Sequence, residues 1–283
     1  MPDKDAPPTR ISLPGILTLA LILLLSMTIS LAEDESEGDG DFFALPSPAE
    51  IIAASESQGL QISLSRKNAG VLKLDLLKLA TDSKPGASFA IGRIFSIAGF
   101  SFKQLSNQVI LQLASKVFIG MKAMKLPATI EGEMEHQYQQ MLKNPSMDRA
   151  EIMISFTAAR SSLMFLMKDP KRVSSEERAL IEPLGTSLEA GLWFQSLMLA
   201  VEGVDSQHLA ALADIFFVED VIDYFDVTLK KAASLSSEKA FFGSLQNLNR
   251  LCREIIADKT ISLEEVASLK PILEKVLQQE AQP

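Results

Sequence analysis

Two histidines, His136 and His208, are the side chains best suited to metal or acid–base chemistry, and each follows a carboxylate by three residues. The pairs are Glu133 with His136 and Asp205 with His208. Glu-x-x-His pairs on two helices of a bundle hold carboxylate-bridged di-iron centres. Helical geometry, however, places His136 about 200° from Met134 of the apolar stripe, and Asp205 is expected to cap a helix whose first turn contains His208. Both pairs then face solvent, and we predict no metal site.

Four acids, Glu219, Asp220, Asp223 and Asp226, resemble the aspartate-rich motif with which terpene synthases hold magnesium. The second metal motif of those enzymes is missing, and apolar residues recur between the acids at helical spacing. We therefore interpret the acids as the solvated face of an amphipathic helix. The sequence also has no glycine-rich phosphate loop, no G-x-S-x-G elbow and no Cys/His cluster. We predict a protein without enzymatic activity and without a cofactor.

Arg160 is the one charge inside the apolar segment MISFTAARSSLMFLM. A buried arginine needs a partner, and Glu189 in the following helix is the favoured candidate. The alternative is that Arg160 lines a pocket for an anionic ligand, in a carrier that holds a hydrophobic or amphiphilic molecule between its helices. The single cysteine, Cys252, excludes an intrachain disulfide and is expected to be a small buried hydrophobic residue.

Charge is strongly segregated along the chain, although the net charge is only −9. Residues 83–130 contain no acid, whereas residues 131–283 contain 24 acids and 15 bases. A net negative charge argues against binding to nucleic acid. Cations beside an apolar helical stripe favour an anionic membrane surface or an acidic protein partner. The alternative is that the basic block only complements the acidic bundle within the fold. The candidate binding residues are the cations Arg93, Lys103, Lys116, Lys122 and Lys125, together with Arg160.

Residues 11–32 form an uncharged apolar run that begins after Arg10 and ends with small residues at Ser30 and Ala32. This pattern is typical of an export signal with a cleavage site after Ala32. An uncleaved anchor is the alternative, since about 20 apolar residues span a bilayer. Six acids follow the run in residues 33–48 and predict an acidic disordered tether. Both interpretations place residues 49–283 outside the cytoplasm, periplasmic or secreted, with possible tethering by residues 11–32.

Periodicity and capping signals predict mostly helices after the tether. A β-hairpin is expected over residues 60–77, where a helix also fits part of the pattern, and residues 88–103 are expected to be a strand pair or a broken helix. Ser174 with Glu177 and Ser262 with Glu265 have the spacing of capping boxes. The predicted helices are residues 48–58, 104–126, 128–143, 147–167, 174–201 with a kink or split at Pro183, 207–233, 237–258 and 262–279.

The expected fold is mainly α, an antiparallel bundle of about six or seven helices over residues 104–283. Residues 49–103 are expected to form a short irregular or hairpin-containing portion of the same domain. The composition, the export signal expected in residues 11–32 and the charge pattern together predict an exported, non-enzymatic helical envelope protein that binds a membrane surface or another envelope component. The carrier of a hydrophobic or amphiphilic ligand is the alternative function.

Overall fold

The computed structural model describes residues 45–60, 62, 68–101, 105–143, 174–257 and 260–278, which all belong to one compact unit, Phe43–Pro283. In these residues the regular structure is helical, with no strand, which confirms the predicted mainly α bundle. The elements are α2 (Pro48–Ser57), the 3-10 helix η1 (Asn68–Lys73), α3 (Leu76–Asp82), α4 (Lys84–Ser101), α5 (Asn107–Ala123), α6 (Ala128–Lys143), α8 (Ser175–Gly203), α9 (Leu209–Phe216), α10 (Glu219–Leu235), α11 (Lys239–Ile256) and α12 (Leu263–Gln278).

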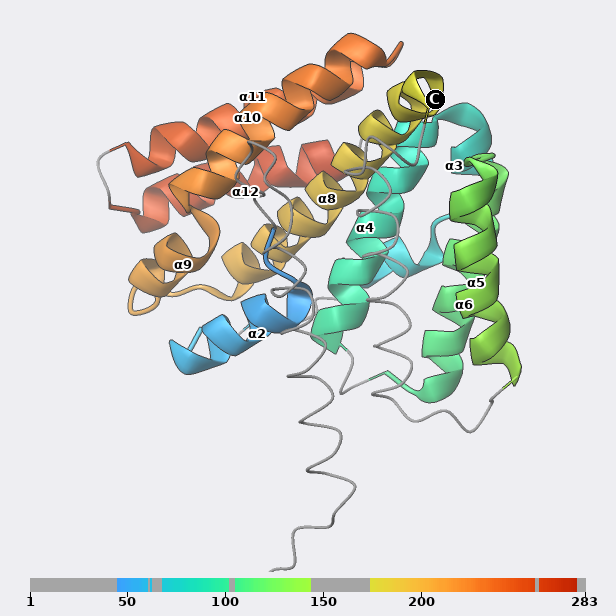
Figure 1. The fold of residues 1–283 in the computed structure, drawn as a ribbon. Helices are drawn as coiled ribbons and strands as arrows, with labels where there is room; N and C mark the ends of the chain where they lie inside the picture. Colours follow the sequence, from blue (N-terminus) through green and yellow to red (C-terminus); the bar gives the residue numbers. More distant parts are fainter. Residues whose placement is uncertain are drawn as a thin grey trace, which may run out of the picture. The chain divides into compact units, whose positions relative to one another are not determined.

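Helices α4 and α8 form the centre of the fold and are buried along most of their length (Figure 1). Both are apolar on nearly every side, which is the composition of a helix that is covered all round. Glycines allow the two backbones to touch. A Cβ atom on Gly92 would lie 2.0 Å from the Leu188 carbonyl oxygen, and one on Gly191 would lie 2.1 Å from that of Phe89.

Hydrogen bonds made by polar side chains also join α4 to α8. The Ser88 hydroxyl donates to the Leu184 carbonyl at 2.6 Å, and the hydroxyls of Ser96 and Ser196 are 2.8 Å apart. Successive contacts rise together along both helices, so α4 and α8 run parallel. The pair α5 and α6, joined by a short loop, is instead antiparallel, as predicted: Ser115 of α5 bonds to Tyr138 of α6, whereas the later Lys122 lies beside the earlier Glu135.

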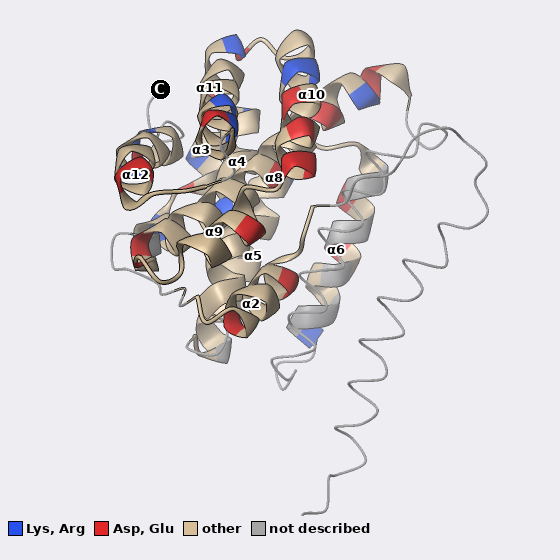
Figure 2. Ribbon diagram, turned by 90° about the vertical axis from the view of Figure 1, so that its left-hand side faces the viewer, with Lys and Arg blue, Asp and Glu red and all other residues tan. Residues whose placement is uncertain are grey.

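The remaining described helices cover the central pair from two sides (Figure 1). One apolar cluster joins α8 to α2 and to α9 through α12, and the other joins α4 and α8 to η1, α3 and α5. Figure 2 shows acidic segments and no basic ones on α2 and α9. The fold therefore has one side built by α3, α5 and α6 and another built by α2 and the C-terminal helices.

Three helices begin with the capping boxes that their sequences suggest. In α2, α8 and α12 a serine hydroxyl accepts from the backbone N–H three residues on, and a glutamate at that position accepts from the serine N–H. The pKa of Glu177 is held below its ordinary value chiefly by the hydrogen bond from the Ser174 backbone. Local hydrogen bonding alone fixes these helix starts, which explains why sequence patterns locate them.

The predicted hairpin over residues 60–77 is wrong where the structure describes it. Residues 68–73 form η1, and α3 begins at Leu76. Asp75 caps α3 by accepting from the Lys78 N–H at 3.1 Å. The alternation of Leu72, Leu74 and Leu76 arises because these side chains reach the same apolar cluster from a tight turn and a helix start.

The structure differs from the predictions for three further segments. Residues 88–101 are neither a strand pair nor a broken helix but part of the continuous helix α4, whose glycines serve close packing. Helix α8 is continuous through Pro183, so the helix is not split there. Conversely, the single helix expected over residues 207–233 is divided at Phe217 and Val218, whose backbones are not helical. No proline or glycine marks that break in the sequence. Phe217, which stands at the break, is buried in the core.

No helix in the described ranges is both long enough and apolar enough to span a bilayer. The apolar run of residues 11–32, residues 33–44 of the predicted tether and the helix predicted over residues 147–167 lie outside the described residues. The tether was predicted to extend to residue 48, but Leu45 is buried in the core and Ser47 caps α2, so its last residues are ordered.

Candidate functional site: the outer face of α3 and α5

Arg93 is not on the surface, although its position in the basic block made it a candidate binding residue. Its side chain is buried in the α4–α8 crossing, where Nε donates to Gln195 Oε1 at 2.8 Å and Nη1 donates to the Leu277 carbonyl. Burial lowers the pKa of Arg93 to about 9. Because Leu277 stands in the last turn of α12, the guanidinium holds a carbonyl at the negative end of that helix. Arg93 is therefore a structural residue.

Lys103 and Arg160 lie outside the described residues. The proposed partner of Arg160, Glu189, is buried in α8 and accepts a hydrogen bond from the Tyr224 hydroxyl of α10. Glu189 thus takes part in joining α8 to α10.

The other three candidate lysines are on α5 or directly after it. Lys116 is partly buried and donates to the Leu72 carbonyl at 2.9 Å, and its pKa is lowered by burial while Asp75 opposes the shift. Lys122 is exposed, lies 3.6 Å from Glu135 of α6 and stands over the Phe118 ring at 5.9 Å from its centre. Within the described chain, Lys125 has no ion pair and is exposed to solvent on the loop after α5.

Lys125 also has an unusual backbone, with φ of 53°. This is the left-handed conformation that glycine normally supplies just after a helix. The N–H of Lys125 donates to the Lys122 carbonyl at 3.1 Å, so the residue closes the last turn of α5. A lysine in this position costs stability relative to glycine, and strained positions of this kind are concentrated at functional sites.

Two exposed apolar side chains accompany these lysines, and composition alone did not single them out. Leu77 of α3 is 55% exposed and Ile119 of α5 is 51% exposed. Lys116 reaches Leu72, and Gly120 packs against Leu76, so α3 and α5 run in the same direction.

One residue corresponds to a rotation of about 100° on a helix. Leu77 follows Leu76, the residue of α3 that contacts α5, and Ile119 precedes Gly120, the residue of α5 that contacts α3. Because the two helices run in the same direction, both side chains turn to the same side of the helix pair. The opposite side carries Leu79 and Leu113, which are buried in the cluster with α4. Leu77 and Ile119 consequently share the outer face, next to Lys116 and Lys122. We call this surface, Leu77, Lys116, Ile119, Lys122 and Lys125, the α3–α5 face.

The side of the fold built by α2, α9 and the start of α10 has the opposite charge. Residues 179–229 contain nine acids and neither lysine nor arginine, a complement of the acid-free block that the sequence already contains. The exposed acids on that side are Glu50 of α2 together with Asp205, Asp214, Glu219 and Asp220 of this segment. The two charge blocks are thus carried by helices on different sides of the α4–α8 pair (Figures 1 and 2).

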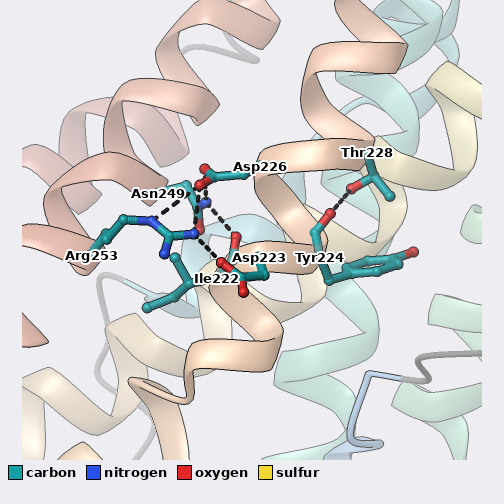
Figure 3. A network of polar contacts seen from close by, with 7 residues as sticks. All are labelled: Ile222, Asp223, Tyr224, Asp226, Thr228, Asn249 and Arg253. Carbon is teal, nitrogen blue, oxygen red and sulfur yellow. Dashed lines mark hydrogen bonds and ion pairs between the residues drawn. The ribbon is translucent and has the colours of Figure 1, made fainter. Parts of the chain in front are cut away.

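The remaining acids of the aspartate-rich motif take part in helix pairing. Arg253 of α11 donates to both Asp223 and Asp226 of α10, and Asn249 donates to Asp226 at 2.6 Å and to the Ile222 carbonyl at 2.9 Å (Figure 3). The two carboxylates raise the pKa of Arg253. The apolar residues between the acids are buried, as predicted from their spacing.

Neither histidine lies in a cluster of ligands in the described part of the chain. His136 is exposed. His208 Nδ1 lies 2.7 Å from Asp205 Oδ1, in the turn before α9, and this hydrogen bond is the main cause of the lowered pKa of Asp205. Asp205 was expected to cap this helix, but the N-cap of α9 is His208. Asp205 instead bonds to His208 in the turn that precedes the helix.

A half-open hollow of about 300 Å³ adjoins the α3–α5 face, between α5 and α6. Phe118 and Met121 supply its apolar wall, and Phe118 stacks on Tyr138 with ring centres 4.3 Å apart. Its charged groups are Lys122 from α5 and Glu131 and Glu135 from α6.

The antiparallel α5–α6 pair brings these groups together across the loop that contains Lys125. Helical spacing within α6 would have placed Glu131 and Glu135 on one face, but only the folded structure shows that both lie near Lys122.

No protein family, characterised protein or solved structure matches the chain.

Proposed function

We propose that the protein is an exported, non-enzymatic helical protein that binds an anionic membrane surface through the α3–α5 face. The observation that carries this proposal is the pair of exposed apolar side chains, Leu77 and Ile119, on the same side as the lysines of the acid-free block. Apolar groups enter the boundary between headgroups and acyl chains, while cations attract anionic lipid. The acid-rich side, on the other flank of the α4–α8 pair, would face away from the membrane.

The magnitudes favour weak, reversible binding. A fully buried Leu or Ile side chain contributes about 1.5–3 kcal/mol. Leu77 and Ile119 are about half exposed, so each can contribute roughly 1 kcal/mol on entering lipid. Each lysine near an anionic surface adds about 1 kcal/mol. Two apolar residues and two or three lysines therefore supply only a few kcal/mol of binding free energy. If residues 11–32 act as an anchor, they would hold the protein near the membrane independently of this face.

A lysine footprint with the full-length chain tests the proposal without interference from residues 11–32. The chain is mixed with vesicles of phosphatidylcholine, with or without phosphatidylglycerol, and exposed amines are acetylated and mapped by mass spectrometry. Lys125 should become protected only with the anionic vesicles, and salt should remove the protection. Lys230 on α10 is an exposed lysine on the other flank and should be acetylated equally in both cases.

Substitutions separate the two contributions. Replacing Leu77 and Ile119 by serine should weaken the protection of Lys125 at least fivefold in lipid concentration. The matched control is Val227→Ser, because Val227 is 67% exposed on α10. Equal protection of Lys125 and Lys230, or a loss caused by Val227→Ser as large as that caused by the paired substitution, contradicts the proposal. Sequencing of the mature N-terminus tests export separately, since a soluble form that begins at Glu33 requires removal of residues 1–32.

A further inference from the structure

We infer that the hollow between α5 and α6 is a binding site for a zwitterionic phosphoamine headgroup, that of phosphatidylethanolamine, with Lys122 facing the phosphate and Glu131 and Glu135 facing the ammonium. The inference rests on the proposed membrane binding, because the hollow adjoins the α3–α5 face, and it adds a zwitterionic lipid that the hollow binds beside the anionic lipid that the face attracts. A volume of about 300 Å³ is at the lower end of small-molecule sites and suits a headgroup rather than a whole lipid.

The charges in the hollow favour a zwitterion over an anion. Lys122 Nζ lies 3.6 Å from Glu135 Oε2, which is longer than a direct hydrogen bond, and both side chains are about half exposed. Because both side chains are exposed enough to swing apart, a phosphoamine can replace their ion pair, with its phosphate on the lysine and its ammonium on the carboxylates. Every charge then keeps a partner of opposite sign. A simple anion would occupy Lys122 and face two carboxylates without compensation.

The walls of the hollow add orientation. Phe118 is fixed by stacking on Tyr138, whose hydroxyl donates to Ser115 Oγ at 3.0 Å, so the ring presents a rigid apolar surface beside Lys122. Ile119 precedes Lys122 by three residues, and residues at this spacing are neighbours on a helix surface. The exposed Ile119 side chain can therefore contact the glycerol and acyl region of a lipid whose headgroup lies in the hollow.

Gly132 makes the hollow testable. A Cβ atom on Gly132 would have no atom within 4 Å, and Gly132 lines the hollow. Gly132→Leu should fill the space without removing a charge or colliding with a neighbour. Gly243 of α11 has the same open surroundings at a distant position, so Gly243→Leu is the matched control for the change in helix propensity.

The experiment uses water-soluble headgroups, so that it does not depend on a membrane surface. The full-length chain is held in an alkyl maltoside, and the binding of glycerophosphoethanolamine, glycerophosphocholine and glycerophosphoglycerol is measured by ligand-observed NMR. Glycerophosphoethanolamine should bind about tenfold or more tightly than the other two, which corresponds to a hydrogen bond between charged groups. Phosphocholine has no N–H to donate, and phosphoglycerol has no cation.

The variants decide the assignment. Gly132→Leu should abolish binding of glycerophosphoethanolamine, and Gly243→Leu should leave it unchanged. Glu131→Gln with Glu135→Gln should remove the preference for the amine. Equal binding of the three headgroups, or an unchanged affinity in Gly132→Leu, overturns the inference. If the preference is found but vesicles do not protect Lys125, the headgroup site stands and the proposed membrane face is wrong; the reverse result rejects only the headgroup site.

Discussion

Replacement of Gly92 by alanine should strongly destabilise the fold, although alanine is the better helix former. In an exposed helix, Gly→Ala gains up to about 1 kcal/mol. At Gly92 the new Cβ would lie 2.0 Å from the Leu188 carbonyl oxygen and 2.8 Å from the Leu192 nitrogen. Both are backbone atoms and cannot rotate away. Ordinary contact begins near 3.4 Å, so α4 and α8 would have to separate by roughly 1.4 Å, the difference between 3.4 and 2.0 Å.

That separation also weakens the hydrogen bonds of the crossing. Overpacking of a core costs about 1–3 kcal/mol, and each lost hydrogen bond costs about 1 kcal/mol. The bonds from Ser88 to Leu184 and between Ser96 and Ser196 both cross the same interface. The expected loss is about 3–5 kcal/mol of the free energy of unfolding, a large share of the roughly 5–15 kcal/mol typical of proteins.

Urea unfolding of the full-length chain measures this effect. Far-ultraviolet circular dichroism follows the helices, and the fluorescence of Trp193, the single tryptophan, reports on α8 because its side chain is buried there. Gly132→Ala and Gly243→Ala are the controls, and each should stabilise by about 0.5–1 kcal/mol. The close-approach explanation is refuted if Gly92→Ala destabilises by less than about 1 kcal/mol, or if it behaves like the two controls.

Three further predictions follow from individual residues. Cys252 should not react with thiol reagents in the folded protein at neutral pH, because burial raises its pKa to about 12; mass labelling in and out of urea measures this. Lys125→Gly should raise the free energy of unfolding by about 1 kcal/mol, as chemical denaturation would measure, because it relieves a left-handed backbone. His208→Ala should return the pKa of Asp205 toward its ordinary value in an NMR titration. With His208 present, the stability that Asp205 supplies is complete above its ordinary pKa and is lost as the pH falls through the lower, folded value.

Each of these predictions has a contrary outcome. Rapid labelling of Cys252 in the native protein would show that the α11 face opens. A Lys125→Gly variant that is less stable would show that the lysine side chain, and not the backbone conformation, stabilises the end of α5. An Asp205 pKa that is the same with and without His208 would show that the turn before α9 does not depend on their hydrogen bond, with Ser206→Ala as the control for changes in the same turn.

The ends of several helices could be predicted because their causes are local. Ser47, Ser174 and Ser262 each bond to a glutamate three residues away, and no distant residue takes part. The spacing of apolar residues in α10 also predicted its buried face, and Cys252 of α11 is buried as expected. Glycine and proline were misleading for the same reason. A rule based on local conformation treats Gly92 as a breaker and allows a split at Pro183, whereas dense packing maintains both helices.

The proposed binding face also combines features that the sequence shows with features that only tertiary packing decides. The sequence by itself determined that cations and acids occupy separate segments, since charge order is a property of the chain. It could not separate Arg93, which is in the core, from Lys122 and Lys125, which are exposed, because all three belong to one acid-free block. That distinction depends on which side of α4 packs against α8, and the contact of Gly120 with Leu76 decides that Leu77 and Ile119 turn outward together. Tertiary packing alone decided these positions, because the contacts that bury or expose a side chain join residues far apart in the sequence.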